Sequence, residues 1–325
     1  MQKFQQKIKK YALEQGFDLV GFTKAKIESK YIKAYKTWLK NGHQASMKWM
    51  EKSKPREDFT KILPRAKSVI VLGINYYNPQ KPLKKDHARV ARYACGRDYH
   101  KIIGKKLKTI ETFIRNLIKS HPDFTQIQTK SYVDTGPILE RALAEQAGLG
   151  TIGKNSCFIT KEYGSWVFLA EIITNLDLYN DKAEKHQNQP ENINPHPLCG
   201  RCIRCIDACP TGAIIAPGVI DSRKCISYQT IENKGKIPKK LAKKIKNSKY
   251  IFGCDICQKV CPQNIAKQQI TSHKELNHPK IAGDQIPLKK ILSLKSEKEF
   301  TEKFAGSPLM RAKLKGLKRT AKILT

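Results

Sequence analysis

Apolar residues follow two alternating patterns along the first 180 residues of the chain. A helical spacing of three or four positions is carried by Ile103, Leu107, Ile110, Ile114 and Leu117. The first sixteen residues show a similar spacing. Continuous apolar runs at 68–74 and 166–173 are typical of buried strands. This alternation predicts an α/β domain over residues 1–180.

The pattern changes beyond residue 180. Residues 180–197 are polar and rich in Asn, Gln and Pro, which predicts a boundary loop. A cysteine-rich segment follows at 198–265, and a helical tail at 287–325. Ser307 and Pro308 are typical of a helix start, and one helix face is predicted from Met310, Leu314, Leu317, Ala321 and Leu324. The predicted fold class is α+β, with three units.

Composition limits the class of protein further. A chain of 325 residues can bury the cores of two domains. No apolar stretch reaches transmembrane length and no signal sequence opens the chain, so we expect a cytoplasmic protein without membrane contact. The formal net charge of +34 favours polyanionic partners, above all nucleic acid. The alternative explanation of this charge is the base composition of the genome, because an AT-rich genome also encodes chains rich in Lys, Ile and Asn.

Eight cysteines share one spacing pattern. Three are separated by two residues each, a fourth follows after three and precedes Pro210, Cys225 stands alone, and the last three end before Pro262. This pattern is typical of bacterial ferredoxins with two [4Fe-4S] clusters, in which the cysteine before proline ligates the other cluster. We therefore expect a first cysteine set of Cys199, Cys202, Cys205 and Cys261, and a second cysteine set of Cys209, Cys225, Cys254 and Cys257. Structural zinc and disulfides are the alternatives, but neither explains the repeated Cys-Pro.

Three further segments carry candidate chemistry. Asp134 precedes a predicted helix, where an aspartate is commonly only a cap or turn residue. Residues 147–155 hold three glycines that permit tight turns, but they do not form a dinucleotide fingerprint. Cys95 and Cys157 lie outside the cluster pattern, and such cysteines are mostly small buried side chains.

Taken together, these segments resemble the epoxyqueuosine reductase family of cobalamin-dependent iron-sulfur enzymes. The resemblance covers most of residues 90–265 and is carried by RYACGRDYH from Arg92, VDTGPILER from Val133, AGLGTIGKN from Ala147, GSWVFLAEI from Gly164, CGRCIRCIDACPTGAI from Cys199, CISYQTIENKG from Cys225 and FGCDICQKVCPQN from Phe252. The tail is similar to a single HEAT-like helical unit. Thr151 and Gln263 stand where the family often has tryptophan.

The resemblance implies an oxidoreductase that converts epoxyqueuosine, at the wobble position of certain tRNA anticodons, to queuosine with loss of water. Cobalamin and two [4Fe-4S] clusters would supply the electrons. Asp134 matches the family's proton donor, and burial near a corrinoid is expected to raise its pKa. The positions that match cofactor-contacting segments are Arg56, Cys95, Asp134, Lys154, Asn155, Ser227, Gln229 and Thr230.

A histidine ligand to cobalt is not expected. Asp98, His100 and Gly104 have one residue more than the D-x-H-x-x-G signature of one cobalamin-binding class. Cobalamin should therefore bind with its lower base detached from the cobalt. His100 is expected to be a surface or hydrogen-bonding histidine.

Basic residues in the tail form the candidate tRNA contact. Arg311, Lys315, Lys318 and Lys322 make a stripe one position along from the apolar face, and a second basic stretch lies at 234–249. Either can bind the phosphates of an anticodon stem-loop, or be a solvated face. We expect a monomer served by an unidentified low-potential electron donor. A reductive dehalogenase-like enzyme and a non-enzymatic electron carrier are the alternative functions.

Overall fold

The main sheet lies in the first half of the chain. The structure, a computed structural model, describes residues 2–119, 126–179, 196–277 and 281–325. Four strands form the sheet in the order β1-β2-β7-β4, with β1 Leu19–Lys24, β2 Ser68–Asn75, β4 Thr129–Tyr132 and β7 Val167–Thr174. All three pairings are antiparallel. The helix and strand alternation, which is typical of parallel sheets, therefore belongs here to an antiparallel one.

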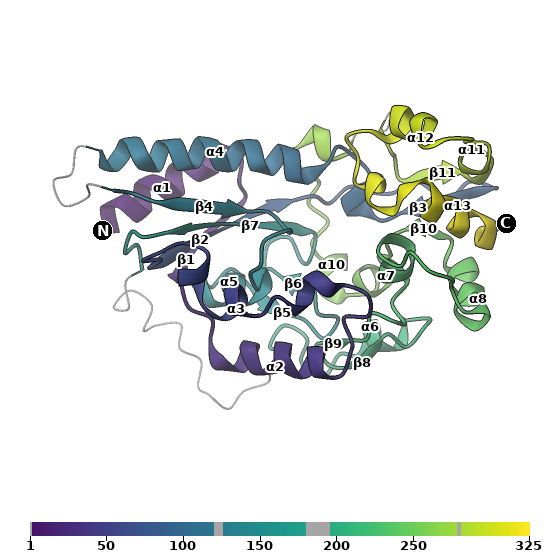
Figure 1. Ribbon diagram of the computed structural model, residues 1–325, viewed down its shortest axis with the longest axis horizontal. Helices are drawn as coiled ribbons and strands as arrows, with labels where there is room; N and C mark the ends of the chain where they lie inside the picture. Colours follow the sequence, from purple (N-terminus) through teal and green to yellow (C-terminus); the bar gives the residue numbers. More distant parts are fainter. Residues whose placement is uncertain (1, 120–125, 180–195, 278–280) are drawn as a thin grey trace.

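Helices cover both faces of this sheet. Figure 1 shows α1 (Gln2–Glu14) and α4 (Tyr99–Ile118) along one face and α5 (Glu140–Gln146) on the other. Successive strand residues point to opposite faces, so the all-buried β2 serves two cores. One contains Ile70 and Ile103, and the other contains Val71 and Leu143. The predicted strands at 68–74 and 166–173 and the predicted helix are thus present.

Smaller elements connect these parts. They are α2 (Ser29–Lys40), η1 (Lys48–Glu51), α3 (Lys54–Glu57), η2 (Phe59–Lys61), η3 (Arg92–Ala94), β5 (Thr151–Ile152) and β6 (Phe158–Ile159). The polar stretch predicted as a boundary loop lies, apart from its last two residues, outside the described residues.

A second sheet joins distant parts of the chain. Its strands β3 (His87–Val90), β10 (Tyr250–Phe252) and β11 (Gln285–Pro287) are ordered β10-β3-β11. Val90 and Phe252 share a core with Leu317 of the tail. Segments from both sides of residue 180 therefore build this core together.

The cysteine-rich segment consists of short elements around turns. They are α6 (Arg204–Asp207), β8 (Ile214–Ala216), β9 (Val219–Ile220), α7 (Ile226–Ile231), α8 (Lys239–Ser248), α9 (Ile256–Lys259), α10 (Pro262–Ile265) and η4 (Lys274–Asn277). Pro262 directly follows Cys261 and is the first residue of α10. Proline is well tolerated at the start of a helix, so α10 can begin immediately after this cysteine.

The tail is helical, but its last helix starts later than the sequence predicts. The elements are α11 (Leu288–Leu292), α12 (Glu297–Phe304), the 3-10 turn η5 (Pro308–Ala312) and α13 (Lys313–Leu324). The Ser307 hydroxyl donates to the Phe304 carbonyl at 2.8 Å instead of capping a helix, and Lys313 has a φ of 58°. This positive φ at the first residue of α13 breaks the regular backbone after η5, so Arg311 is not on the same helix as Lys315. The likeness to a HEAT unit stays a prediction.

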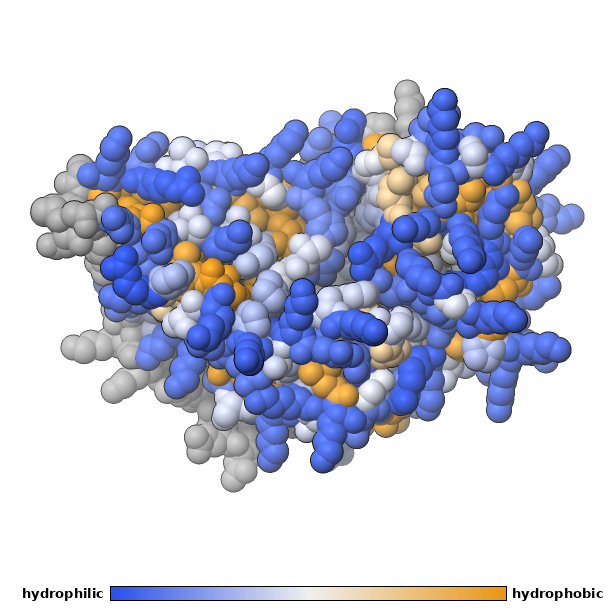
Figure 2. All heavy atoms as spheres, in the orientation of Figure 1, coloured by the Kyte–Doolittle hydropathy of each residue, from blue (hydrophilic) through white to orange (hydrophobic). Residues whose placement is uncertain are grey.

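Hydrophilic side chains dominate the face shown in Figure 2, where apolar patches are small and separate. None of the helices in the described ranges is long and apolar enough to span a membrane.

Candidate active site and cysteine sets

The first cysteine set lines one small cavity. Cys199, Cys202, Cys205 and Cys261 surround it together with Asn155 and Gln263. The helix α6 supplies Cys205, and the turn before α10 brings in Cys261 from far along the chain. Cys199 and Cys261, which are far apart in the cysteine-rich segment, thus meet in the cysteine set that the spacing predicts.

The second cysteine set is gathered in a neighbouring place. Burial raises the pKa of the Cys254 thiol to about 12, and the nearby Cys225 and Cys209 thiols add to that rise. The hydrogen bond with Cys157 and burial raise the pKa of the Cys257 thiol, and the Cys254 and Cys225 thiols add to that rise. All ten cysteines of the chain are free, which removes the disulfide alternative.

The two remaining cysteines differ in surroundings. Cys95 is 3% exposed, and its thiol donates to the Ala91 carbonyl at 3.5 Å, so it packs as a small buried side chain. Cys157 lies beside the second cysteine set, where its thiol hydrogen-bonds with Cys257.

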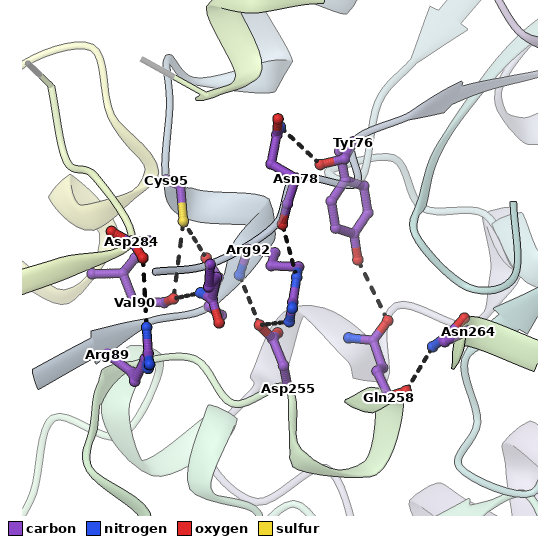
Figure 3. Close-up of polar contacts among 12 residues, drawn as sticks. Tyr76, Asn78, Arg89, Val90, Arg92, Cys95, Asp255, Gln258, Asn264 and Asp284 are labelled. Carbon is purple, nitrogen blue, oxygen red and sulfur yellow. Dashed lines mark hydrogen bonds and ion pairs between the residues drawn. The ribbon is translucent and has the colours of Figure 1, made fainter. Parts of the chain in front are cut away.

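A polar network ties the cysteine-rich segment to the first half of the chain (Figure 3). The buried Asp255, between two cysteines of the second set, accepts a hydrogen bond from the Arg92 backbone N–H at 2.9 Å. The Arg92 guanidinium lies 3.5 Å from the same carboxylate and stacks over Trp166. The RYACGRDYH stretch therefore anchors the second cysteine set to the rest of the fold.

Asp134 lies in the loop between β4 and α5, with a φ of 58°. Its Oδ2 accepts the Tyr99 hydroxyl at 2.7 Å and lies 3.4 Å from His100 Nε2. Its backbone N–H donates to Glu140 Oε1 at 2.6 Å. The residue before α5 is Leu139, so Asp134 is not a helix cap. With 59% of its area exposed, the side chain is open to a substrate.

His100 is held in this site by a second carboxylate. Its Nδ1 lies 2.7 Å from Asp98 Oδ1, and its Nε2 faces Asp134. Burial lowers the pKa of His100, but its interactions with Asp134 and Asp98 outweigh burial and raise that pKa to about 9. The expectation of a hydrogen-bonding histidine is confirmed, and its position facing Asp134 is what the sequence did not indicate. The sequence feature that could have indicated this position is Asp98, two residues earlier, whose carboxylate orients the imidazole ring.

The pKa of Asp134 shifts opposite to the expected direction. Desolvation raises it, but interactions with His100, the Tyr99 hydrogen bond and the charge of Arg311 outweigh desolvation, and the pKa is lowered. At neutral pH the structure therefore has an ionised Asp134 facing a protonated His100.

Aromatic rings connect this acid site to the second cysteine set. Tyr93 contacts Tyr99 on one side and Phe252 on the other, each with ring centroids 6.2 Å apart. Burial raises the pKa of Tyr93, and the charges of Asp134 and Asp255 add to that rise. Tyr93 therefore lies between the acid site and the cysteines.

The candidate cofactor residues fall into two groups. Gln229 and Thr230 of α7 and Cys95 are buried and bonded within the protein, with Thr230 accepting the Gly253 N–H at 3.0 Å. Arg56 is 4% exposed with an unpartnered Nε, and Ser227 of α7 is partly exposed. The second group thus differs from the first by the unpartnered Arg56 Nε and the partly exposed Ser227.

The glycine-rich loop brings Lys154 and Asn155 against the cysteine-rich segment. The Lys154 Nζ donates to the Gly200 carbonyl at 2.7 Å, and the buried Asn155 lines the cavity of the first cysteine set. A Cβ on Gly150 would approach the Ile159 carbonyl oxygen to 2.2 Å, so this close packing requires glycine.

The candidate tRNA contacts do not form one uniform stripe. Arg311 pairs with Glu232 through two hydrogen bonds, at 2.9 and 3.0 Å, and stacks over Trp49. Lys315 and Lys322 are exposed and Lys318 is partly exposed on α13. Lys246 of α8 donates to the Thr325 carbonyl at 2.9 Å, so the two basic stretches adjoin.

Two sets of four cysteines beside an acid and histidine pair define an iron-sulfur redox protein. Residues 198–264 match the family described as 4Fe-4S double cluster binding domain, which favours clusters over zinc. Residues 56–135 match the family described as Epoxyqueuosine reductase QueG, DUF1730.

Whole-chain comparisons agree. The epoxyqueuosine reductase of Gloeobacter violaceus is 40% identical to this chain, over 97% of this chain and 93% of the relative. That of Synechocystis is 41% identical, over 88% of this chain and 92% of the relative. A crystal structure of epoxyqueuosine reductase with an epoxyqueuosine-modified tRNA-Tyr stem loop has a TM-score of 0.84 and 34% identity, over 99% of this chain and 80% of that one. The Bacillus subtilis enzyme, with its catalytic aspartate loop swung out of the active site, has a TM-score of 0.82 and 31% identity, over 99% and 81%. The chain belongs to the epoxyqueuosine reductase family.

Proposed function

We propose that this protein reduces the epoxide of epoxyqueuosine at the wobble position of tRNA anticodons, giving the alkene of queuosine and water. The observation that carries this proposal is the Asp134 and His100 pair, linked through Tyr93 toward the second cysteine set, in a chain of this family. A relative of the same fold holds an epoxyqueuosine-modified tRNA stem loop.

The reaction consumes two electrons and two protons for each epoxide oxygen that leaves as water. In this proposal each cysteine set would hold one [4Fe-4S] cluster, which would supply single electrons drawn from a low-potential donor. Cys261 and Cys209 each precede a proline and each joins the set at the other end of the segment. The two sets are therefore interlocked, which keeps both clusters in one rigid unit.

Cobalamin is the second proposed cofactor, and the residues present fit it in part. The unpartnered Nε of buried Arg56 and the buried, unpartnered Thr151 Oγ1 are polar atoms that a bound group can satisfy. Arg56, Lys154, Asn155 and Ser227 would contact the corrinoid, while Cys95, Gln229 and Thr230 would shape its site through packing. When bound, its reduced cobalt supplies a strong nucleophile toward the epoxide.

Asp134 donates the proton in this account, and His100 stores it. The proton rests on His100 Nε2 at neutral pH, since the pKa of that imidazole is about 9. A substrate that excludes water from Asp134 raises the pKa of the carboxyl group, which favours transfer of the proton from His100 to Asp134 Oδ2. Asp134 then protonates the departing oxygen, and Tyr99 keeps the carboxyl group oriented.

The loop that carries Asp134 is proposed to have two positions, as the swung-out loop of the Bacillus subtilis relative suggests. In the position seen here, the hydrogen bond from the Asp134 N–H to Glu140 holds the loop inward. An outward position would open the site for RNA to enter and leave.

The anticodon stem-loop would bind across the basic surface of α8 and α13. Phosphate contacts from Lys315, Lys318, Lys322 and residues 234–249 position the RNA, and the modified base turns out of its stack to reach Asp134. Arg311 has a different place, since its charge acts on Asp134 and its partner is Glu232. In this proposal Arg311 therefore acts on Asp134 and not on the phosphates.

The test is an assay on tRNA that carries epoxyqueuosine, after anaerobic reconstitution with iron, sulfide and cobalamin. We expect queuosine in the product tRNA. Bound cobalamin adds visible absorption bands that iron-sulfur clusters lack, which also separates this proposal from an electron carrier. A protein with full clusters that neither takes up cobalamin nor changes the tRNA is an electron carrier instead.

A further inference from the structure

Glu171 is a buried acid in the middle of the main sheet that no step above uses. It lies on β7, is 0% exposed, and neither carboxylate oxygen has a hydrogen-bond donor among the described residues. Its strand partners in register are Val71 on β2 and Tyr132 on β4. An ionised carboxylate in such a place is costly, so a proton or a hydrogen-bonded partner must be present.

The partner is Glu140, the first residue of α5. The two carboxyl groups lie within hydrogen-bonding reach of each other, and since two ionised carboxylates have no donor between them, a bond between them requires a proton. Burial and the neighbouring carboxylates raise the pKa of Glu140 to about 8 and that of Glu171 well above its ordinary value. The pair therefore keeps at least one proton at neutral pH.

Few charged groups face this pair. Asp134 opposes ionisation of Glu140, and Arg141 favours it. Tyr99 is the other ionisable neighbour, and the Glu140 charge helps raise the pKa of its hydroxyl. Arg141 also hydrogen-bonds to the Ser156 carbonyl. On the sheet side, Val71 and Ile173 are apolar, and Lys130 of β4, which is in register with Ile173, is exposed with its ammonium over the Tyr132 ring. A positive charge that could replace the shared proton is therefore not supplied by the sheet.

Glu140 also holds the loop of Asp134. Its Oε1 accepts the Asp134 backbone N–H at 2.6 Å, while Asp134 has a left-handed φ of 58° that an aspartate adopts only at some cost. A chain of contacts thus runs from the centre of the sheet, through Glu171 and Glu140, to the backbone of Asp134.

We propose that Glu171 and Glu140 form a protonated carboxyl pair that holds the Asp134 loop in its inward position, so that both act as positioning residues for the acid. This inference rests on the proposed role of Asp134. Without the Glu171 partner, Glu140 loses its anchor on the sheet, and the loop shifts toward the outward position.

The experiment compares Glu171→Gln, which keeps a hydrogen bond to Glu140, with Glu171→Leu, which removes it, and with the exposed Glu162→Gln as control. In the reconstituted enzyme acting on epoxyqueuosine stem-loop RNA, Glu171→Leu should lower kcat by about 10²-fold with KM little changed, as for a misplaced catalytic group. Glu171→Gln should restore most of the lost turnover. Leucine suits this apolar face, so the fold should persist, which the melting temperature checks.

Two readouts do not depend on turnover. The infrared spectrum of the reconstituted protein at neutral pH should show a protonated carboxylic acid in wild type and in Glu162→Gln, and lose it in Glu171→Gln. Backbone amide exchange at Asp134 should be faster in Glu171→Leu than in wild type. Absence of the acid signal in wild type, or unchanged amide exchange together with wild-type kcat in Glu171→Leu, overturns the inference. Lack of queuosine formation by wild type, with both readouts as expected, instead overturns the proposed function alone.

Discussion

The imidazole of His100 and the carboxylate of Asp134 face each other, with Nε2 and Oδ2 3.4 Å apart. This distance makes an ion pair without a close hydrogen bond, so the proton is localised on the histidine. A small change in the surroundings of either group is enough to move it, because the two groups compete for one proton.

His100→Gln should therefore remove the stored proton while keeping a side chain that can donate a hydrogen bond. We expect turnover to fall by about 10²-fold, the usual contribution of a general acid or base. The pKa of His100 is raised to about 9, so in wild type its contribution is full below that pH and is lost as the pH rises through it. The alkaline decline in kcat near pH 9 should be absent from the variant. A variant with the wild-type pH profile would return His100 to a structural role.

Asp134→Asn tests the acid itself. Asparagine has nearly the same shape and tolerates the left-handed backbone of this position, so folding and cluster content should persist. Turnover should fall by about 10²-fold or more. A matched control is Asp86→Asn, since Asp86 is exposed and also has a φ of 58°. Equal turnover of the two variants would show that Asp134 only shapes the loop.

The buried carboxyl pair predicts how stability depends on pH. The pKa of Glu140 rises from 4.5 to about 8 on folding, so the folded state binds more protons than the unfolded state between these values. The free energy of unfolding should therefore fall as the pH rises through this range. Denaturant titrations across it should show a weaker fall for Glu171→Gln, which removes one of the two buried acids. A variant with the same slope as wild type would contradict a raised pKa.

Iron content tests the interlocked cysteine sets. Anaerobically reconstituted protein should bind about eight iron atoms in two [4Fe-4S] clusters. Cys225→Ser should disturb the cluster of the second cysteine set and leave the first, visible as two separate signals in electron paramagnetic resonance. Zinc without acid-labile sulfide, or loss of both clusters, would contradict this assignment.

Charge on α13 should affect RNA binding more than chemistry. Replacing Lys315, Lys318 and Lys322 together by glutamine should reduce the slope of log K against log salt by about 2 to 3, with kcat little changed. Lys7, Lys9 and Lys10 of α1, at the opposite end of the molecule in Figure 1, are the charge-matched control. An unchanged slope would place the RNA elsewhere.

Arg311→Gln should instead lower kcat, because Arg311 acts on Asp134.

Local patterns in the sequence were sufficient for part of this account. The buried run of β2 and the apolar face of α4 are properties of one segment each, so periodicity alone reveals them. The cysteine spacing likewise predicts the two groupings that the structure brings together, because ligand spacing is fixed by cluster geometry.

Contacts between distant segments could not be predicted in the same way. The strand β3 pairs with β10 and β11 from the last third of the chain, and no local pattern specifies that. Glu171 has the sequence context of a buried strand, and only its packing against α5 gives it a partner. The direction of the Asp134 pKa shift depends on its contact with His100 of α4, and no local pattern specifies that contact.

The central claim is that electrons from the two clusters remove the epoxide oxygen of epoxyqueuosine in RNA. The most direct measurement is a single turnover of the reconstituted, cobalamin-loaded and chemically reduced protein on an epoxyqueuosine stem-loop. Queuosine is measured by mass, and cluster oxidation by its absorbance. The account predicts one oxygen atom lost and two electrons consumed for each queuosine formed. Unchanged epoxyqueuosine with the clusters still reduced would contradict it.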